Sequence, residues 1–291
     1  MKLPFVSVII PTYHDWHRLR VCLDALKHQT YDRNRYEVIV VNNAVDEPPA
    51  DLRLPDSWML EVEPKPGSYA ARNRGIRVSH GEILAFTDSD CIPDPEWIEE
   101  AARILRQGAN RVAGRVELFY KGIRLTPAEL YEKAFAFRQE KNAAAGSAVT
   151  ANMLAWRYCF TRTGVFNEAL MSGGDYEWGI RAHELGLNIA YVSEAVVYHP
   201  ARATIRELVK KRRRVIDGKC RMGVLRLNRH TAGALIRSAR PPLSRFRKVA
   251  KLSGFTWFEK LLLAAVLYYI RLYDTYAEWR VVRRLSNANR S

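Results

Sequence analysis

Cysteine is scarce in this 291-residue sequence, and its uncharged apolar runs are short. The four cysteines, at positions 22, 91, 159 and 220, are scattered, and no two have the spacing of a metal-binding pair. Reduced thiols of this kind predict a cytoplasmic protein. The first apolar run, FVSVII at 5–10, leads straight into a turn and predicts no signal peptide. The uncharged run at 261–270 covers only about half of the ~20 residues that span a bilayer.

Acidic residues are scarce in the last third of the chain. Residues 201–291 contain 23 Lys and Arg but only 5 Asp and Glu, a net charge of +18, whereas residues 1–200 contain 23 and 26, a net charge of −3. We therefore expect one domain at 1–200 and a basic helical region at 201–291. This asymmetry indicates that the basic part meets a polyanion, either nucleic acid or an anionic membrane surface. A basic face that is merely solvated is the alternative.

Short apolar runs alternate with helical patterns along the first hundred residues. Strands are expected at 5–10, 36–41, 57–62 and 82–87, with helices between them, one of these at 68–79. Continuous apolar strands that alternate with helices predict an α/β fold with a parallel sheet covered by helices. In such sheets ligands bind beyond the carboxyl ends of the strands. Polar groups at 12–15, 42–43 and 88–90 each follow a strand, so we expect a site where these ends meet.

The remainder of the chain is mixed, and its last helix is open to two interpretations. Helices are expected at 97–107, 127–141, 173–186 and 257–285, a strand at 111–119 and a strand pair at 188–198, while Arg and Lys dominate 202–251. The helix at 257–285 is rich in Leu, Tyr and Trp, which suit the headgroup boundary of a membrane, and its Arg side chains suit anionic lipid. The alternative is a helix packed on the first domain or in a homo-oligomer.

Two carboxylates, Asp88 and Asp90, follow the apolar strand EILAFT, with Ser89 between them. Hard oxygen ligands placed directly after a buried strand make a natural site for Mn²⁺ or Mg²⁺. Such a cation neutralises a diphosphate and stabilises it as a leaving group. A D-x-D pattern also occurs by chance in acidic turns, so the motif gains its weight from its position after the strand.

A second acidic group, Gly-Gly-Asp-Tyr-Glu at 173–177, opens a predicted helix. Asp175 would be stabilised in its ionised form at a helix N-terminus and could accept a proton from an attacking hydroxyl. The alternative is that Asp175 only caps the helix. His199, at the end of the last predicted strand, could complete a metal shell with a neutral imidazole, or it could be purely structural.

In this order, the segments resemble the large glycosyltransferase family two, whose members have the GT-A fold. The similarity runs from VSVIIPTYHDWHRL through EVIVVNNA, GSYAARNRGI and GEILAFTDSDCIPDPEWI to GGDYEWGIRAHELGLNIAYVSEAVVYHP. It covers roughly residues 5–200, and the combination is specific where each piece is not. The resemblance implies a Rossmann-like, mostly parallel central sheet flanked by helices, here followed by a basic, amphipathic helical extension.

The resemblance also implies roles for individual residues. Nucleotide-sugar binding falls on Pro11, Thr12, Tyr13, Asp15, Asn42, Arg72, Asn73, Asp88 and Ser89, metal binding on Asp90 and His199, and catalysis on Asp175 and Glu177. Asn42 stands where the family usually has an aspartate that reads the base or ribose. Gly174 stands where the family often has a glutamate, which leaves Glu177 as a substitute base or an acceptor-site partner. The spacing of Arg181 from Asp175 fits the family and favours Asp175 as the base.

The function that the resemblance implies is a metal-dependent, inverting transfer of a hexosyl or N-acetylhexosaminyl group. The donor would be a nucleoside-diphosphate sugar, expected to be a UDP-sugar. The acceptor would be a glycan or a lipid-linked glycan in the synthesis of cell-surface polysaccharide or glycolipid. Family members of this kind often hold basic C-terminal segments against the membrane, so we expect a peripheral protein on its cytoplasmic face.

Two other functions share part of this evidence. A sugar-phosphate nucleotidyltransferase would have the same nucleotide pocket and acidic metal site, but the turn at 11–13 lacks the Gly-rich, Lys-bearing loop of those enzymes. A non-enzymatic nucleic-acid-binding protein would explain the basic tail. Because no recognised nucleic-acid module appears and the basic residues lie outside the nucleotide-type domain, we expect no nucleic-acid partner.

Overall fold

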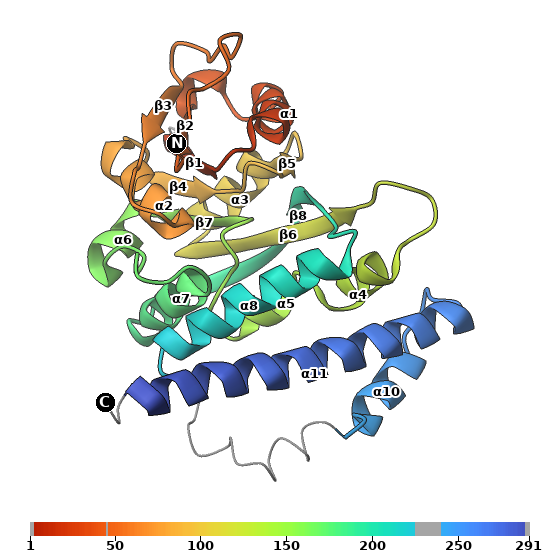
Figure 1. Cartoon of the computed structure of the whole chain (residues 1–291). Coiled ribbons are helices and arrows are strands. Elements are labelled where there is room, and N and C mark those ends of the chain that lie inside the picture. The colour runs from red at the N-terminus through yellow and green to blue at the C-terminus, as the bar shows by residue number, and fades with distance from the viewer. Residues whose placement is uncertain (1–2, 45, 225–239, 289–291) are drawn as a thin grey trace. The chain divides into compact units, whose positions relative to one another are not determined.

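One sheet organises the first two hundred residues. The computed structural model describes residues 3–44, 46–224 and 240–288, and within them eight strands form a sheet in the order β3-β2-β1-β4-β7-β6-β8-β5 (Figure 1). The strands are β1 (Val6–Thr12), β2 (Tyr36–Asn42), β3 (Met59–Val62), β4 (Ile83–Phe86), β5 (Ile92–Pro93), β6 (Arg111–Phe119), β7 (Met153–Trp156) and β8 (Ile189–Pro200). Four of the neighbouring pairs are parallel and three, which involve β5 and β7, are antiparallel. The expected mostly parallel sheet is confirmed.

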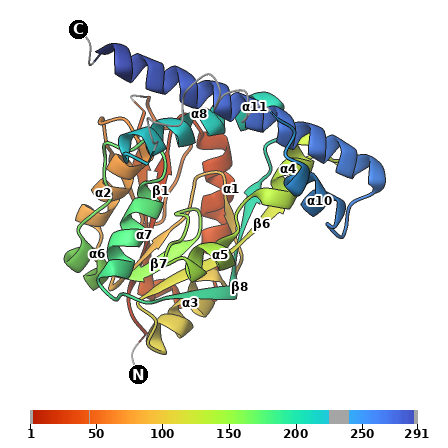
Figure 2. The same ribbon diagram turned by 90° about the horizontal axis from the view of Figure 1, so that it is seen from below.

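Helices cover both faces of this sheet. They are α1 (Trp16–Lys27), α2 (Ser68–Val78), α3 (Trp97–Arg106), α5 (Gln139–Ala144), α6 (Arg157–Thr163) and α7 (Gly174–Glu184), with a 3-10 turn at Arg33–Arg35. Figure 2 shows α2, α6 and α7 together on one side of β1, with α1 on the other. A sheet covered in this way explains why its strands are continuous apolar runs rather than alternating ones.

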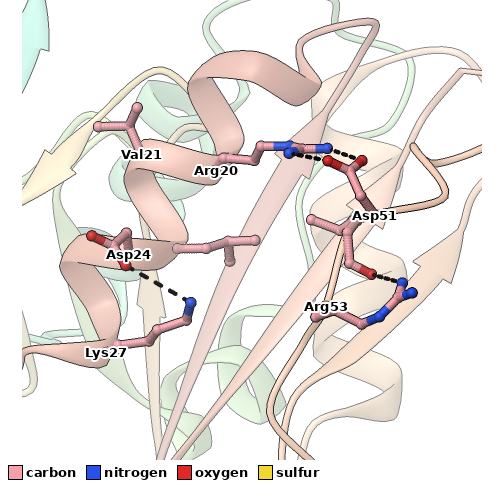
Figure 3. Close-up of a pocket in the computed structure, with 8 residues that line it drawn as sticks. Arg20, Val21, Asp24, Lys27, Asp51 and Arg53 are labelled. Carbon is pink, nitrogen blue, oxygen red and sulfur yellow. Dashed lines mark hydrogen bonds and ion pairs between the residues drawn. The ribbon is translucent and has the colours of Figure 1, made fainter.

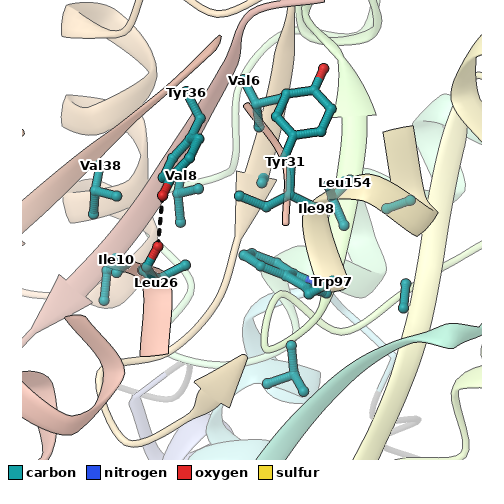
Figure 4. Close-up of a cluster of buried hydrophobic side chains, with 14 of the residues drawn as sticks. Val6, Val8, Ile10, Leu26, Tyr31, Tyr36, Val38, Trp97, Ile98 and Leu154 are labelled. Atoms are coloured by element: carbon teal, nitrogen blue, oxygen red, sulfur yellow. Dashed lines mark hydrogen bonds between the residues drawn. The ribbon is translucent and has the colours of Figure 1, made fainter. Parts of the chain in front are cut away.

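The alternation of side chains along β1 builds the two buried layers. Val6, Val8 and Ile10 point into a cluster with Leu26 of α1 and Trp97 of α3, and all five are fully buried (Figure 4). Burial of each such side chain stabilises the fold by roughly 1.5–3 kcal/mol. Successive residues of a strand face opposite ways, so the intervening side chains of β1 meet α2 instead.

Close approach of α2 to β1 depends on a glycine. A Cβ added to Gly75 would lie 2.5 Å from Cγ2 of Ile9, so only glycine lets the helix backbone pack this tightly. Further along the same face, Phe160 of α6 stacks on Trp178 of α7 with ring centroids 4.3 Å apart, and Phe86 of β4 lies against this pair. These contacts fix α2, α6 and α7 over the strand ends that carry the polar residues.

A buried arginine holds α7 to the sheet. Arg111, at the start of β6, donates hydrogen bonds to the carbonyls of Gly146 (3.0 Å), Gly179 (3.3 Å) and Leu187 (2.7 Å). Burial lowers the pKa of Arg111 to about 10, so the side chain remains a cationic donor near neutral pH. Because the three carbonyls come from the loop before β7, from α7 and from the segment after it, one side chain fixes all three.

The chain forms two compact units, one of residues 1–119 with 137–200 and the other of residues 120–136 with 201–291. The second unit therefore includes 120–136, which lie inside the range expected for the first domain. Its helices are α4 (Pro127–Phe135), α8 (Ile205–Arg221), α10 (Leu243–Ala250) and α11 (Trp257–Ala288). Among the helices that the structure describes, none combines the length and hydropathy needed to cross a membrane.

Side-chain caps and one apolar face build the second unit. Thr126 starts α4 and Thr204 starts α8, each in a capping box with the glutamate three residues later. The buried face of α11 packs against α4, α8 and α10 through Leu263, Val266, Leu267 and Ile270.

Two sequence predictions about elements were wrong. The helix expected at 127–141 is divided into α4 and α5, because Phe137 has a φ of 45° and a non-glycine residue in that region interrupts a helix. The strand pair expected at 188–198 is the single strand β8, which pairs with β6 at 189–192 and 196–200, with a shift of register between residues 114 and 115 of β6. Part of the basic stretch 202–251, residues 225–239, lies outside the described residues.

Candidate active site

The carboxyl ends of three neighbouring parallel strands meet at one edge of the sheet. In the register of the sheet, Thr12 at the end of β1 lies beside Asn42 at the end of β2. On the other side of β1, Ile9 pairs with Phe86, so the segment 88–90 continues from β4 at the same edge. The polar groups predicted to converge do come from adjacent strand ends.

Buried polar atoms without partners lie at this edge. Among the described residues, Thr12 Oγ1, Thr87 Oγ1 and Arg72 Nε are inaccessible to solvent and have no hydrogen-bond partner. Buried polar groups are nearly always paired in folded proteins, and an orphan calls for an unbound ligand, ion or water. Orphan atoms also occur elsewhere, at Arg111 Nε and Thr163 Oγ1, so those at this edge support a binding site only together with the acidic segment 88–90.

A short antiparallel pairing brings His199 to the acidic turn. Strand β5 pairs with β8 so that Ile92 lies opposite Tyr198, which puts Cys91 opposite His199. One ligand atom from each of Asp88, Asp90, Cys91 and His199 then lies within 4.8 Å of all the others. Residues 88–91 and 199 therefore form one cluster, as expected for a metal site.

The histidine presents a free nitrogen to this cluster. Nδ1 of His199 lies 2.8 Å from the carbonyl oxygen of Pro200, which can only accept, so Nδ1 carries a proton. Nε2 lies 3.8 Å from Oδ1 of Asp90, and in the neutral ring this nitrogen carries the lone pair that can bind a cation. A histidine oriented by a backbone carbonyl in this way is the usual arrangement of a metal ligand.

The surroundings of Asp90 disfavour its charged form. Burial raises the pKa of Asp90, and the neighbouring Asp88 raises it further, while His199 and Arg18 act in the opposite direction. Arg18 Nη1 lies 3.5 Å from Asp90 Oδ2, too far for a strong ion pair. A divalent cation between Asp88 and Asp90 would relieve this repulsion, and two carboxylates with one imidazole fit Mn²⁺ or Mg²⁺.

Cys91 was not predicted in this cluster, and its chemistry sets it apart. Burial raises the pKa of its thiol well above the usual range, and Asp88 and Asp90 add to the effect. A protonated thiol is a poor ligand for hard cations. The fitting donor set is therefore Asp88, Asp90 and His199.

Helix α2 links the metal cluster to the second acidic group. Arg72 of α2 forms an ion pair with Asp88, and its guanidinium carbon lies 5.6 Å from the ring centre of Tyr69, one turn earlier. The Tyr69 hydroxyl in turn donates to Oδ1 of Asp175, 3.0 Å away. Tyr69 was not among the predicted site residues.

Asp175 is held by three donors and is not the cap of α7. Its Oδ1 accepts from Tyr69 and from the amide of Tyr176 (2.9 Å), and its Oδ2 accepts from the amide of Thr150 (3.2 Å). The N-cap position belongs to Gly173, in the left-handed region with a φ of 82°. Among the described residues Asp175 has no cationic partner, so its carboxylate is oriented but not neutralised.

Glu177 has a different environment. Both of its oxygens accept from Arg181, at 2.6 Å and 3.0 Å. Arg181 also donates to the carbonyl of Val165 at 3.0 Å. The Arg181 spacing noted in the sequence therefore serves Glu177, in an i to i+4 pair, and leaves Asp175 free to act.

Two predicted donor-binding residues use their amides within the protein. Asn42 donates to the carbonyl of Asp46 and accepts from the amide of Ala44, both at 2.9 Å. Asn73 donates to the carbonyl of Phe166 (2.8 Å) and to Glu168 (2.9 Å). Direct contact of either side chain with a donor stays a prediction.

The other predicted donor-site residues surround the same edge. Tyr13 is 65% exposed, Asp15 pairs with Arg18 at 2.9 Å, Ser89 is buried, and Pro11 is half-buried in β1. Residues that the sequence did not point to are Arg18, Tyr69, Thr87, Cys91 and Thr150. Thr87 and Cys91 directly flank the acidic motif at 88–90, whereas Arg18, Tyr69 and Thr150 reach this edge only through tertiary packing.

A separate cavity of about 460 Å³ lies between α1 and the segment 51–53. Figure 3 shows Arg20 paired with Asp51 and Lys27 paired with Asp24 at 3.8 Å, while Arg53 donates to the backbone carbonyl of Leu52. The cavity contains none of the predicted site residues.

The sequence matches the family model described as Glycosyl transferase family 2 over residues 7–212. The chain belongs to this family. It is 37% identical over 232 residues to the glycosyltransferase AglE of Haloferax volcanii, a match that covers 77% of this chain and 75% of AglE. It is 31% identical over 108 residues to the putative glycosyltransferase EpsH of Bacillus subtilis, covering 35% of this chain and 31% of EpsH.

A solved structure shares the fold. The mannosyltransferase PcManGT of Pyrobaculum calidifontis, determined in complex with GDP-Man and Mn²⁺, has a TM-score of 0.59 and 20% identity, over 98% of this chain and 76% of PcManGT. The expected GT-A fold is confirmed, and so is the expectation that this family 2 protein is a glycosyltransferase. Membership of this family is evidence against the nucleotidyltransferase alternative and against a purely non-enzymatic protein.

Proposed function

We propose that this family 2 enzyme transfers a sugar from a nucleoside-diphosphate sugar, taken to be a UDP-sugar, in a reaction that depends on Mn²⁺ or Mg²⁺. The observation that carries the proposal is the cluster of Asp88, Asp90 and His199 beside buried polar atoms that lack partners. The presence of GDP-Man and Mn²⁺ in PcManGT supports the same chemistry here. When bound, the cation would neutralise the diphosphate and make it a better leaving group.

The proposed chemistry assigns Asp175 as the general base. The acceptor hydroxyl would give its proton to Asp175 as its oxygen bonds to the anomeric carbon. The bond from that carbon to the diphosphate oxygen breaks on the opposite face, so the configuration inverts and the nucleoside diphosphate leaves. Tyr69 and the amide of Thr150 orient the base, and Arg72 holds Asp88. Positioning and neutralisation of charge would supply most of the rate.

The nucleobase of the sugar donor is less well determined than its diphosphate. Asn42, in place of the family aspartate, already shapes the turn after β2 through its bonds to 44 and 46. Its amide is uncharged, so base recognition would rest on other groups around 11–15. UDP-sugars and GDP-sugars should therefore be compared directly.

For the acceptor, we propose a glycan or lipid-linked glycan at the cytoplasmic face of a membrane, in cell-surface polysaccharide or glycolipid synthesis. The net charge of +18 in residues 201–291 supports a peripheral location on anionic lipid. The alternative is that the second unit uses this surface to form a homo-oligomer.

A thermal-shift series tests the donor and the metal together. UDP-sugars and GDP-sugars are added with Mn²⁺ or with EDTA, because only a ligand that binds the folded state raises the melting temperature. We expect a rise with Mn²⁺ that disappears in EDTA and in Asp90→Ala. The matched control Asp24→Ala removes an exposed carboxylate of α1 and should keep the rise. A rise in melting temperature that is equal with Mn²⁺ and with EDTA, or equal in wild type and in Asp90→Ala, would contradict a role of the metal in donor binding.

A further inference from the structure

Helix α11 has an uncovered apolar face opposite its buried one. Its exposed side chains recur every three or four residues, at Phe258, Leu261, Ala265, Tyr269, Leu272 and Tyr276, which we call the apolar stripe. This spacing places them on one side of the helix. From 258 to 276 the stripe runs for about 27 Å along the helix axis.

The exposure of the stripe is large. Phe258 is 66% exposed, and Tyr269 and Tyr276 are 49% and 51% exposed. Isolated exposed apolar residues are ordinary on protein surfaces, but a continuous row marks a contact with a membrane or another molecule. The buried face of the same helix packs within the second unit, and those contacts do not cover the stripe.

A cationic cavity lies at one end of the stripe, between α8 and α11. It has a volume of about 290 Å³ and is lined by Arg213, Ile216, Asp217, Tyr273, Tyr276, Ala277, Arg280 and Val281. The guanidinium of Arg280 lies 5.7 Å from the ring centre of Tyr276, the last residue of the stripe. Two guanidinium groups and two phenol hydroxyls against a single carboxylate make a site for a phosphate group.

We propose that the apolar stripe lies in the surface of an anionic bilayer and that the cavity at Arg213 and Arg280 holds the phosphate of one lipid. The exposed stripe carries aromatic residues and has Arg280 at its end, which suits the headgroup region of a bilayer with the stripe facing inward. This inference rests on the membrane association proposed above and names the surface that makes it. It does not depend on the sugar donor.

Charge favours lipid over a second copy of the chain as the binding partner of the apolar stripe. Two copies meeting at their stripes would bring together two segments 201–291, each of which has 23 basic residues and only 5 acidic ones. Like charges at this density repel, whereas anionic headgroups compensate them. Nucleic acid would compensate the charge but would leave the apolar stripe in water.

Vesicle co-sedimentation of the full chain tests the inference. Vesicles of phosphatidylcholine alone are compared with vesicles that also contain phosphatidylglycerol. Leu261→Glu/Tyr269→Glu should weaken binding to both at least tenfold, whereas the control Val21→Glu/Leu185→Glu, at similarly exposed positions of the first unit, should bind as the wild type does. Arg213→Gln/Arg280→Gln should lose the preference for phosphatidylglycerol, and the control Lys121→Gln/Lys141→Gln should keep it.

The outcomes separate this inference from the proposals on which it rests. A wild type that does not sediment with anionic vesicles would contradict membrane association and the stripe together. A wild type that sediments, with stripe variants that sediment equally well, would contradict the stripe alone. A wild-type dimer that becomes monomeric in Leu261→Glu/Tyr269→Glu would show that the stripe binds a second copy of the chain and would contradict lipid as its partner. Inorganic phosphate that stabilises the wild type but not Arg213→Gln/Arg280→Gln, with unchanged vesicle preference, would assign the cavity to a free anion.

Discussion

The hydroxyl of Tyr69 donates a hydrogen bond to Oδ1 of Asp175 at 3.0 Å, across 106 residues of sequence. Burial raises the pKa of Tyr69, and the charge of Asp175 raises it further, so the hydroxyl stays protonated and remains a donor. One turn along the same helix, Arg72 pairs with Asp88. Helix α2 therefore ties the proposed base to the acidic turn that would hold the metal.

Replacement of Tyr69 by Phe should impair turnover without loss of donor binding. The ring stays in place, but Asp175 loses one of its three donors, and a hydrogen bond to a charged group contributes about 1.5–3 kcal/mol. We expect kcat to fall roughly 10- to 100-fold while the metal-dependent thermal shift with nucleotide sugar is unchanged. Tyr176→Phe, on an exposed neighbour of Asp175, is the control and should be silent. A raised donor KM with normal kcat would show that Tyr69 serves the donor instead.

Gly174→Ala should act on the same hydrogen bond from the other side. A Cβ at position 174 would lie 2.8 Å from Cε2 of Tyr69, so the ring must shift and its hydrogen bond to Asp175 should be disturbed. This contact accounts for glycine where the family often has a glutamate. We expect a kcat loss similar to that of Tyr69→Phe, and the double variant should lose little more than either single one. Gly122→Ala, where an added Cβ meets nothing within 4 Å, is the control. Additive losses would mean that the two residues act independently.

The sequence predicted the parts of this site that depend on regular structure. The polar residues at 12, 42 and 88 converge because apolar runs fix parallel strands and parallel strands end at one edge. Contacts such as that of Tyr69 with Asp175 have no such signature, since the two residues meet only after α2 and α7 pack on the sheet. The break at Phe137 was missed for the same reason: the helical pattern of 127–141 is continuous, and tertiary packing overrides it.

Asp175→Asn and Glu177→Gln distinguish the two candidate bases. Loss of a general base lowers the rate about 10²- to 10⁴-fold, and we expect this in Asp175→Asn with the donor thermal shift intact. Glu177→Gln breaks a partly exposed pair with Arg181, so it should cost only about 0.5 kcal/mol of stability and leave turnover near normal. Initial rates of nucleoside diphosphate release measure both. The reverse pattern would move the base to Glu177.

Glu132 forms two ion pairs within the second unit. It is almost fully buried, and it lies 3.0 Å from Nη1 of Arg202 and 3.3 Å from Nζ of Lys211. Burial alone would raise the pKa of Glu132, but the charges of Lys211 and Arg202 outweigh it and hold that pKa below its ordinary value. A depressed carboxyl pKa in the folded state means that this group stabilises the fold at neutral pH and that the stabilisation is lost as the pH falls.

Glu132→Gln should therefore destabilise the protein at neutral pH and matter less in acid. Removal of one partner of a buried pair costs about 3–5 kcal/mol, and the partial exposure of Arg202 and Lys211 reduces this to roughly 2 kcal/mol. Because glutamine cannot titrate, the gap between wild type and variant should narrow below about pH 4, as Glu132 becomes protonated in the wild type. Urea unfolding at neutral pH and in steps down to about pH 3 measures this gap. Glu140→Gln, at an exposed carboxylate, should show no gap at any pH, and a gap for Glu132→Gln that stays constant in acid would exclude the ion pairs as its cause.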